Sequence, residues 1–341
     1  MTYWVICEGM DGAAGGTGGG YRSLTFELLA QARRLAAMSR DSTVEGPGGP
    51  VVAVAVGDEA GARDVLAGAA DTVVNLTGEG LSPYGSDAWT DALASLLGGG
   101  SGPVPAAAPG DLVLFGEGVR TREVLPRVAA RLGAHAVTNA IDLSLEGERA
   151  VVTRPVMGGK AYGRFACDGI CLLAFRPNSF SADEPAGITT AFVDAVVETA
   201  PNRVEVLGRE IEGDRRVELT EAHIVVAGGR GMKAPENLPL LEELADALKG
   251  AVGVSRSIVD AGWAAHSIQV GKSGKTVAPV LYFACGISGA IHHIMGMDTS
   301  KVVVAINTDP NAPIFQYADY GIVGDALEVL PALTAEVRKL G

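Results

Sequence analysis

Apolar stretches alternate with stretches of helical spacing along most of the chain. The first cycle joins an apolar run at 3–7 to a helical pattern at 24–38. Further apolar, β-branched runs lie at 51–56, 72–76 and 112–115, and further helical patterns at 60–69 and 120–132. Because short buried strands that alternate with helices form βαβ units, this order predicts a parallel sheet covered by helices.

The pattern changes after residue 150. Glycine and proline separate short apolar strands such as 169–175, which predicts an antiparallel addition to the first domain up to about residue 192. The segment 201–218 is rich in charge and is predicted to be a connector that contains a strand, with a domain boundary near Val217. The Gly/Pro/Ala-rich segment 98–110 is predicted to be a flexible surface loop within the first domain.

The βαβ pattern then starts again. Strands are expected at 223–227, 251–254, 280–285, 302–307 and 321–323, and helices at 236–248, 288–295 and 326–340. About five parallel strands would make an open, doubly wound sheet, whose ligands bind beyond the carboxyl ends of the strands. The predicted fold class is therefore α/β with two domains, an N-terminal parallel-sheet domain (1–217) and a C-terminal doubly wound domain (218–341).

Composition narrows the function classes. A chain of 341 residues suits two domains, and a net charge of −13 disfavours binding to a phosphate backbone. No uninterrupted apolar stretch is long enough to span a membrane, and the N-terminus lacks the features of a signal peptide. The four cysteines lack metal-ligand spacing, and Cys167 and Cys171 are expected to be a reduced pair in a cytoplasmic protein.

Two glycine-containing segments imitate nucleotide-binding motifs. The glycine run 12–20 does not match the dinucleotide fingerprint GxGxxG, because Tyr21 and Ser23 occupy the positions where the third glycine is required. A flexible loop is the better interpretation. In the segment 269–276, the glycine required at the start of a P-loop is replaced by His266 or Gln269, so NTP hydrolysis is excluded. Its small residues, cations and hydroxyls suit a polar or anionic ligand, although a plain surface turn would have the same composition.

Three other loops follow predicted strands of the second domain. Residues 286–293 combine glycines with a predicted helix N-terminus, where backbone N–H groups favour a pyrophosphate. Residues 228–231 carry Arg230, and Ser255 precedes Arg256 at the start of a short helix. An ordinary turn or an N-cap explains each loop separately. Their position at successive strand ends of one sheet favours a shared ligand site.

Residues 219–330 resemble the flavin domain of the electron-transfer flavoprotein alpha subunit. The matching motifs are VVAGGRGMK, VGVSRSIVDAGW, QVGKSGKTVAPVLY, GISGAIHHIMGM, AINTDPNAPIF and ADYGIVGD. They occur in the family's order and spacing, which makes the resemblance specific. The first domain is similar to the family more loosely, through GEGVRTREVLPRVAARLGA and VTRPVMGGKA.

The resemblance implies an electron carrier that contains one FAD and no metal. It implies a heterodimer with a beta subunit, which carries an AMP or a second FAD of its own. Acyl-CoA or other dehydrogenases would reduce the FAD, as in fatty acid oxidation, and a quinone oxidoreductase or a similar acceptor would reoxidise it. The FAD-binding residues carried over by motif are Arg230, Ser255, Arg256, Gln269, Val270, Gly271, Lys272, Ser273, Gly286, Ser288, Gly289, Ala290, Ile291, His292, His293, Asn307 and Asp325.

The resemblance also implies individual roles. Arg256 would lie by the isoalloxazine ring, Ser273 would offer its hydroxyl to the flavin N5, and His293 would approach the pyrimidine edge. Asn307 and Asp325 would serve the adenosine half. The chain departs from the family at three positions, with Lys272 and Ser273 in place of Gln and Thr and His292 in place of Gln. The Lys272 ammonium would favour anionic flavin if it faces the ring, and would not if it faces water or the beta subunit.

Two other function classes fit the fold. A nicotinamide- or thiamine-dependent enzyme could use the same architecture, but the dinucleotide fingerprint and its acidic ribose partner are missing. A binding module could hold FAD without redox turnover. Reduction by NADH without any dehydrogenase would indicate an enzyme or an electron-bifurcating variant.

Overall fold

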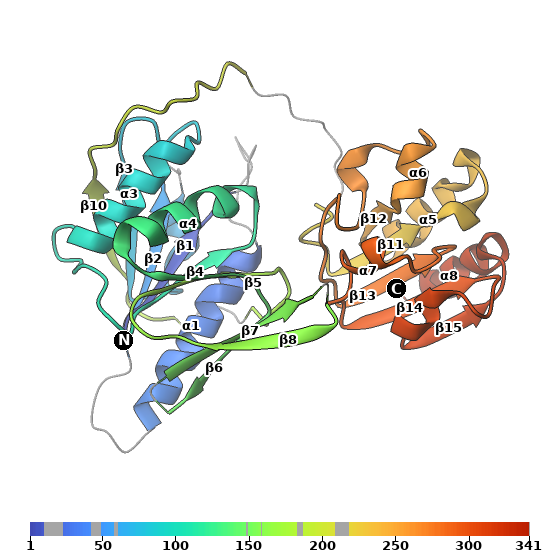
Figure 1. The fold of residues 1–341 in the computed structure, drawn as a ribbon, viewed down its shortest axis with the longest axis horizontal. Coiled ribbons are helices and arrows are strands. Elements are labelled where there is room, and N and C mark those ends of the chain that lie inside the picture. Colours follow the sequence, from blue (N-terminus) through green and yellow to red (C-terminus); the bar gives the residue numbers. More distant parts are fainter. Residues whose placement is uncertain are drawn as a thin grey trace. The chain divides into compact units, whose positions relative to one another are not determined.

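The computed structural model divides the chain into two compact units, Met1–Glu212 and Gly213–Gly341, called here the N-terminal and C-terminal units. The structure describes residues 1–9, 23–41, 49–57, 61–147, 149–157, 159–182, 187–208 and 218–340. The glycine run 12–20 and the boundary predicted near Val217 lie outside these residues. Both units are α/β, as the hydrophobic pattern predicts (Figure 1).

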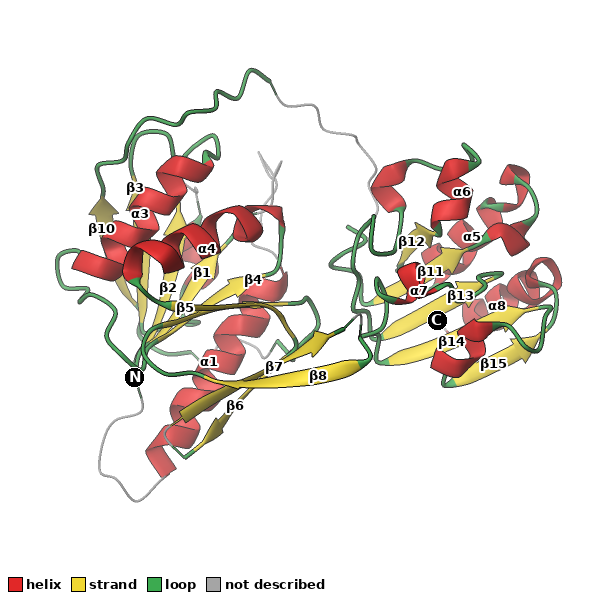
Figure 2. Cartoon of the chain, viewed as in Figure 1, coloured by secondary structure: helices red, strands yellow, loops and turns green. Residues whose placement is uncertain are grey.

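A seven-stranded sheet forms the centre of the N-terminal unit, in the order β10-β3-β2-β1-β4-β9-β5 with every pair parallel (Figure 2). The strands β6, β7 and β8 form a separate antiparallel sheet. The elements of this unit are β1 (Tyr3–Cys7), α1 (Ser23–Asp41), β2 (Val51–Val56), α2 (Ala62–Leu66), β3 (Thr72–Thr77), α3 (Ser86–Gly99), β4 (Leu112–Gly116), α4 (Val119–Leu132), β5 (His135–Ala140), β6 (Asp142–Glu146), β7 (Arg149–Val156), β8 (Ala161–Ala166), β9 (Cys171–Phe175) and β10 (Ala191–Val196).

The two faces of this sheet are covered by different elements. Tyr3 and Val5 of β1 face the core beneath α1, α2 and the antiparallel sheet, whereas Trp4 and Ile6 face α3 and α4. Each of these four side chains is at most 2% exposed. Because successive side chains of a strand point to opposite faces, a strand that is apolar at every position is one that is covered on both sides.

The structure corrects the prediction for 169–175. This segment forms β9, which pairs in parallel with β4 and β5 inside the main sheet, and it is not part of the antiparallel addition. All five residues of Cys171–Phe175 are buried. A continuous apolar run of this kind is typical of a central parallel strand. The antiparallel addition does exist, but it consists of β6, β7 and β8.

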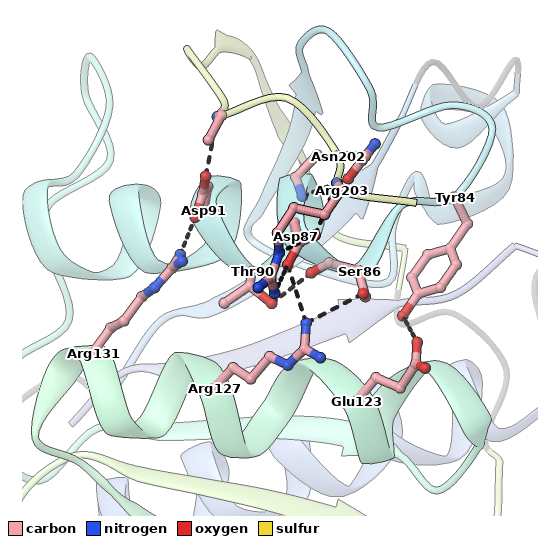
Figure 3. Close-up of polar contacts among 12 residues, drawn as sticks. Tyr84, Ser86, Asp87, Thr90, Asp91, Glu123, Arg127, Arg131, Asn202 and Arg203 are labelled. Atoms are coloured by element: carbon pink, nitrogen blue, oxygen red, sulfur yellow. Dashed lines mark hydrogen bonds and ion pairs between the residues drawn. The ribbon is translucent and has the colours of Figure 1, made fainter. Parts of the chain in front are cut away.

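Residues 201–208 of the predicted connector contain no strand, and residues 209–217 lie outside the described part of the chain. Polar contacts tie the start of this segment to α3 instead (Figure 3). Asn202 Oδ1 accepts a hydrogen bond from the backbone N–H of Ala88 at 3.0 Å, and Arg203 donates to Asp87 Oδ1 at 2.8 Å. The Arg203 guanidinium lowers the pKa of Asp87 to about 2.

The C-terminal unit contains one five-stranded sheet in the order β12-β11-β13-β14-β15, again with every pair parallel. The helices α5 and α8 cover one face together with Met232, and the loops that contain Val270 and Ile314 cover the other. The elements are β11 (Ile224–Gly228), η1 (Arg230–Met232), η2 (Pro235–Asn237), α5 (Pro239–Ala247), β12 (Ala251–Val254), α6 (Arg256–Asp260), η3 (His266–Ile268), β13 (Leu281–Cys285), α7 (Ile291–Ile294), β14 (Val302–Asn307), η4 (Pro313–Tyr317), β15 (Tyr320–Val323) and α8 (Ala326–Leu340).

The helix predicted at 288–295 is shorter than expected. Only α7 (Ile291–Ile294) is helical, and residues 287–290 form a non-helical loop after β13. Gly289 has a φ of +89°, which takes the backbone out of the helical region at this point. The loop that follows β13 therefore presents non-helical backbone at the carboxyl edge of the sheet.

Within the described part of the chain, no helix is both long enough and apolar enough to cross a bilayer.

Candidate functional site

A cavity of about 330 Å³ lies at the carboxyl edge of the C-terminal sheet. Its walls come from the loops after β11, β12 and β13 and from the loop 269–273. The strand order reverses between β11 and β13, which is where ligands bind in open α/β sheets. The lining residues are Gly229, Arg230, Ser255, Arg256, Ser257, Asp260, Gln269, Val270, Gly271, Ser273, Gly286, Ile287, Ser288, Ala290, His292 and His293.

Glycines let the loops after β11 and β13 cross in direct backbone contact. The N–H of Gly231 donates to the carbonyl of Gly286 at 3.0 Å. A Cβ on Gly286 would lie 2.6 Å from the Cα of Gly231, and a Cβ on Gly229 would lie 2.4 Å from the Gly286 carbonyl oxygen. Any other residue at these positions would push the two loops apart, so the glycines define the floor of the cavity.

The loop 269–275 is held from both sides. The backbone N–H of Val270 donates to Val254 at the end of β12, at 2.9 Å, and that of Lys272 donates to His292, at 2.7 Å. The side chain of Gln269 is buried, and its Nε2 donates to Ser273 Oγ at 3.1 Å. These contacts fix Ser273 and Gly271 at the wall of the cavity.

Two arginines supply positive charge at the cavity. Arg256 forms an ion pair with Asp260 one helical turn later, with 3.2 Å between Nε and Oδ2, and both side chains are largely exposed. Arg230 is exposed, and no ion pair joins it to another residue of the described chain. Guanidinium groups of this kind can move to bind phosphate or ring oxygen atoms, because the surface ion pair that holds Arg256 is weak.

His293 is the most deeply buried ionisable side chain of the cavity. Its Nε2 lies 2.9 Å from the Tyr282 hydroxyl, and its buried Nδ1 has no hydrogen-bond partner in the described structure. Burial lowers the pKa of His293 to about 4, and the backbone of Val270 opposes that shift. The imidazole is therefore neutral at physiological pH, with one ring nitrogen available to a ligand.

Most of the residues that the sequence points to come together at this cavity. Five of the predicted positions do not line it: Lys272, Gly289, Ile291, Asn307 and Asp325. The others do, and they are Arg230, Ser255, Arg256, Gln269, Val270, Gly271, Ser273, Gly286, Ser288, Ala290, His292 and His293.

Asn307 and Asp325 follow β14 and β15 and make contacts of their own. Asn307 Nδ2 donates to the carbonyl of Ile287 at 2.9 Å and so braces the loop after β13. Asp325 accepts from Lys233 Nζ at 2.5 Å and from the backbone of Leu327 at 3.0 Å, and Lys233 lowers its pKa. Both side chains lie at the same carboxyl edge as the cavity, further along the sheet.

Sequence reasoning missed four lining residues and one supporting residue. The missed lining residues are Gly229, Ser257, Asp260 and Ile287. The supporting residue is Tyr282, whose hydroxyl forms a hydrogen bond with His293 Nε2. The spacing of four between Arg256 and Asp260 was a readable signal for the acidic partner. No sequence pattern relates Tyr282 to His293, since that contact exists only because β13 passes beneath α7.

The chemistry of the cavity favours binding over bond cleavage. Its polar side chains are hydroxyls, two guanidiniums, the imidazoles of His292 and His293, one amide and one carboxylate, which suit an oxygen-rich or phosphorylated ligand. Among the residues with described positions, no group of His, Cys, Asp and Glu could hold a metal ion.

Comparisons with known proteins agree with this arrangement. The family model described as the electron transfer flavoprotein FAD-binding domain matches residues 218–298, which include the loops that line the cavity. The model described as the electron transfer flavoprotein domain matches residues 13–203.

Curated relatives match over nearly the whole chain. The electron transfer flavoprotein subunit alpha of Bacillus subtilis is 38% identical over 94% of this chain and 95% of its own. The same subunit of Thermoanaerobacterium thermosaccharolyticum is 35% identical over 99% of this chain and 98% of its own. That of Syntrophomonas wolfei is 34% identical over 98% of this chain and 99% of its own.

Proposed function

Because the chain belongs to the electron transfer flavoprotein alpha-subunit family, we propose that the cavity of the C-terminal unit is where it holds its FAD. The family assignment makes the chain an FAD-containing electron transfer protein. The proposal assigns the flavin and its nearest phosphates to the loops after β11, β12 and β13 and to the loop 269–273. The adenosine half extends toward Asn307 and Asp325 along the same edge.

The observation that carries this assignment is the unpartnered Nδ1 of His293 in a glycine-floored cavity. A buried polar nitrogen without a partner costs about 1–3 kcal/mol, which a ligand atom at that point removes. The volume of about 330 Å³ fits one part of an extended dinucleotide, since ligand cavities span about 300–1,000 Å³. The residues present therefore fit the cofactor that the family binds.

When bound, the flavin supplies the electron-transfer chemistry, and the protein contributes binding and electrostatics. Arg230 and Arg256 balance the negative charge of the pyrophosphate and of the reduced ring. Ser255, Ser273 and Ser288 offer hydroxyl hydrogen bonds along the cavity wall. His293 presents a neutral ring nitrogen, and the packed glycines at the floor exclude water from that side.

The proposed partners follow from the family. A beta subunit completes a heterodimer and carries an AMP or a second FAD. Acyl-CoA or other dehydrogenases donate the electrons in fatty acid oxidation, and a quinone oxidoreductase accepts them in a cytoplasmic pathway. Incubation of the purified heterodimer with NADH alone identifies the type of carrier. We expect no reduction without a dehydrogenase, and rapid reduction would indicate an electron-bifurcating complex.

The FAD site is tested by blocking the cavity. Ser288 is exposed and lines the cavity, and Ser267 is exposed in the same unit outside it. In the heterodimer, Ser288→Trp should abolish FAD incorporation because the indole occupies the ligand volume, and Ser267→Trp should leave one FAD per chain. Flavin absorbance against protein concentration measures both. Full FAD occupancy in Ser288→Trp would place the cofactor elsewhere.

A further inference from the structure

The two ring nitrogens of His293 have different surroundings. Nε2 lies 2.9 Å from the hydroxyl of Tyr282, and Nδ1 is buried and makes no hydrogen bond to any described residue. His293 itself is 7% exposed and lines the cavity. The proton of the neutral imidazole can occupy either nitrogen, and its position decides whether the cavity meets a donor or an acceptor.

Tyr282 restricts which ring nitrogen of His293 carries the proton. Its side chain is fully buried in β13, and within the described chain its hydroxyl has no second hydrogen-bond partner. Burial raises its pKa well above the ordinary value, so the phenol keeps its proton. That proton needs an acceptor, and His293 Nε2 is the acceptor within reach.

The two tautomers of His293 therefore differ in free energy. If Nε2 carries the imidazole proton, it donates to the phenol oxygen and leaves the phenol O–H buried without an acceptor, at a cost of about 1–3 kcal/mol. If Nδ1 carries the proton, the phenol O–H donates to Nε2 and is satisfied, and the Nδ1–H is left for an acceptor, for which the nearby backbone of Val270 and a ligand atom compete. A preference of this size corresponds to a ratio of about 5- to 150-fold between the tautomers.

We infer that Tyr282 is a positioning residue that fixes His293 as the Nδ1–H tautomer, so that the cavity presents a neutral N–H donor to its ligand. The ligand atom at this point is then a hydrogen-bond acceptor, such as a carbonyl oxygen or an unprotonated ring nitrogen. The assignment of that atom to the flavin rests on the proposed function. The tautomer of His293 does not rest on the proposed function, because it follows from the contact between Tyr282 in β13 and His293 in α7.

The test uses the FAD-loaded heterodimer with ¹⁵N-labelled histidine. The chain contains five histidines, and the His293 signals are identified by their loss in His293→Gln. We expect the wild type to show a protonated Nδ1 and an unprotonated Nε2 at neutral pH. Tyr282→Phe should shift the two nitrogens toward a mixture of tautomers, because Nε2 loses its donor. A protonated Nε2 in the wild type, or unchanged signals in Tyr282→Phe, would overturn the inference.

FAD affinity and flavin potential provide the second readout. Tyr282→Phe should weaken FAD binding by about 2- to 10-fold, as expected for one hydrogen bond that is no longer preorganised, and should shift the midpoint potential. Tyr320→Phe, at an exposed tyrosine of β15, is the matched control and should change neither. If Tyr282→Phe alters the tautomer but leaves FAD affinity and potential unchanged, His293 does not face the flavin, and that part of the inference is wrong. The cavity-blocking variant Ser288→Trp tests the FAD site independently of either result.

Discussion

The two units have the same kind of sheet edge, but different residues lie at it. In both, parallel strands reverse their order beside the first strand, between β1 and β4 in one unit and between β11 and β13 in the other. In the N-terminal unit, side chains bond to one another across this edge. In the C-terminal unit, glycines and small polar residues leave a cavity there.

Hydrogen bonds join the described residues that lie at the carboxyl edge of the N-terminal sheet. Thr121 donates to Glu8 at 2.8 Å, next to the ends of β1 and β4. Glu117 accepts from the backbone of Asn139 at 2.9 Å, and Asn139 accepts from Arg176 at 2.6 Å, which links β4, β5 and β9. Glu8 and Arg176 are 6% and 5% exposed, so these bonds are made in the interior.

At the C-terminal edge a buried polar atom that lines the cavity has no partner among the described residues, whereas Glu8, Glu117 and Arg176 at the N-terminal edge all make side-chain hydrogen bonds. His293 Nδ1 is the clearest case, because it is buried and faces a cavity. The difference shows that the fold supplies the position of a site, and that the residues at the strand ends decide whether a ligand binds. The predictions below test this contrast.

The largest effect is expected from a methyl group at the glycine floor. Gly286 has a φ of +63°, and its Cβ would meet the Gly231 backbone, whereas Gly133 at the end of α4 has a φ of +61° and open space around its Cβ. Gly133→Ala should cost about 1–2 kcal/mol for the left-handed backbone alone. Gly286→Ala should cost a further 1–3 kcal/mol, about 2–5 kcal/mol in total, because the two loops must separate. Urea unfolding of the heterodimer measures both, and equal losses would show that the loop crossing does not matter.

The second largest effect is expected to be a loss of stability in acid that is caused by the protonation of His293. The pKa of His293 is about 4 in the folded chain and about 6.5 when unfolded, so the unfolded state binds more protons between these values. The stabilisation is complete above pH 6.5 and is lost as pH falls toward 4, by about 3 kcal/mol. His293→Gln should remove this part of the pH dependence, and His266→Gln, at an exposed histidine, should retain it. An unchanged slope in His293→Gln would mean that the ring is accessible to water.

Removal of one hydroxyl from each edge should give opposite patterns. Thr121 donates to Glu8 and to the carbonyl of Gly116, so Thr121→Val should destabilise the N-terminal unit by about 1–3 kcal/mol and leave FAD affinity unchanged. The side-chain hydroxyl of Ser255 bonds only to that of Ser257 among the described residues, so Ser255→Ala should weaken FAD binding with a smaller loss of stability. Thermal unfolding and FAD titration of both variants measure the pattern. Weaker FAD binding in Thr121→Val would contradict the separation of the two edges.

Long regular segments were predictable because each carries its own pattern. The bounds of β1, β2, β12 and α8 follow from the sequence as the structure has them, since buried β-branched runs and amphipathic spacing are local features. The apolar run of β9 is predictable as a strand, but its place between β4 and β5 depends on contacts with residues that are distant in sequence, more than 50 positions away in the case of β4. Local pattern cannot supply such pairings.

The sequence predicts which loops form the site, but it predicts the conformation of those loops less well. The glycine- and hydroxyl-containing loops after the strands mark Arg230, Ser255 and Gly286 as ligand-facing positions. The predicted helix 288–295 begins too early, because residues 288–290 are not helical and Gly289 has a φ of +89°. The Ile314 N–H donates to the carbonyl of Ser288 at 3.1 Å, a contact that no local pattern reveals.

A smaller effect is expected from the charges at the cavity mouth. Arg256→Ala should lower the midpoint potential of the bound flavin, because a cation near the ring favours the reduced anion. The side chain is 68% exposed and paired with Asp260, so the change should be about 1 kcal/mol or less. Asp260→Asn, which removes the neighbouring carboxylate, should raise the potential. Potentiometric titration of both variants decides, and shifts of the same sign would contradict a direct electrostatic role.

The smallest effect is expected at Lys272, which the motif resemblance predicts to differ from the usual residue of the family. Its backbone N–H donates to His292 at 2.7 Å, but its side chain is exposed and does not line the cavity. The loop is thus held through its backbone, and the ammonium lies in water, where the interaction of one charge with the flavin falls to a few tenths of a kcal/mol. Lys272→Gln should therefore change the midpoint potential less than Arg256→Ala does, and added salt should remove what remains. Potentials measured across a salt series make the comparison. A fall larger than that of Arg256→Ala, and insensitive to salt, would show that Lys272 turns toward the flavin when FAD binds.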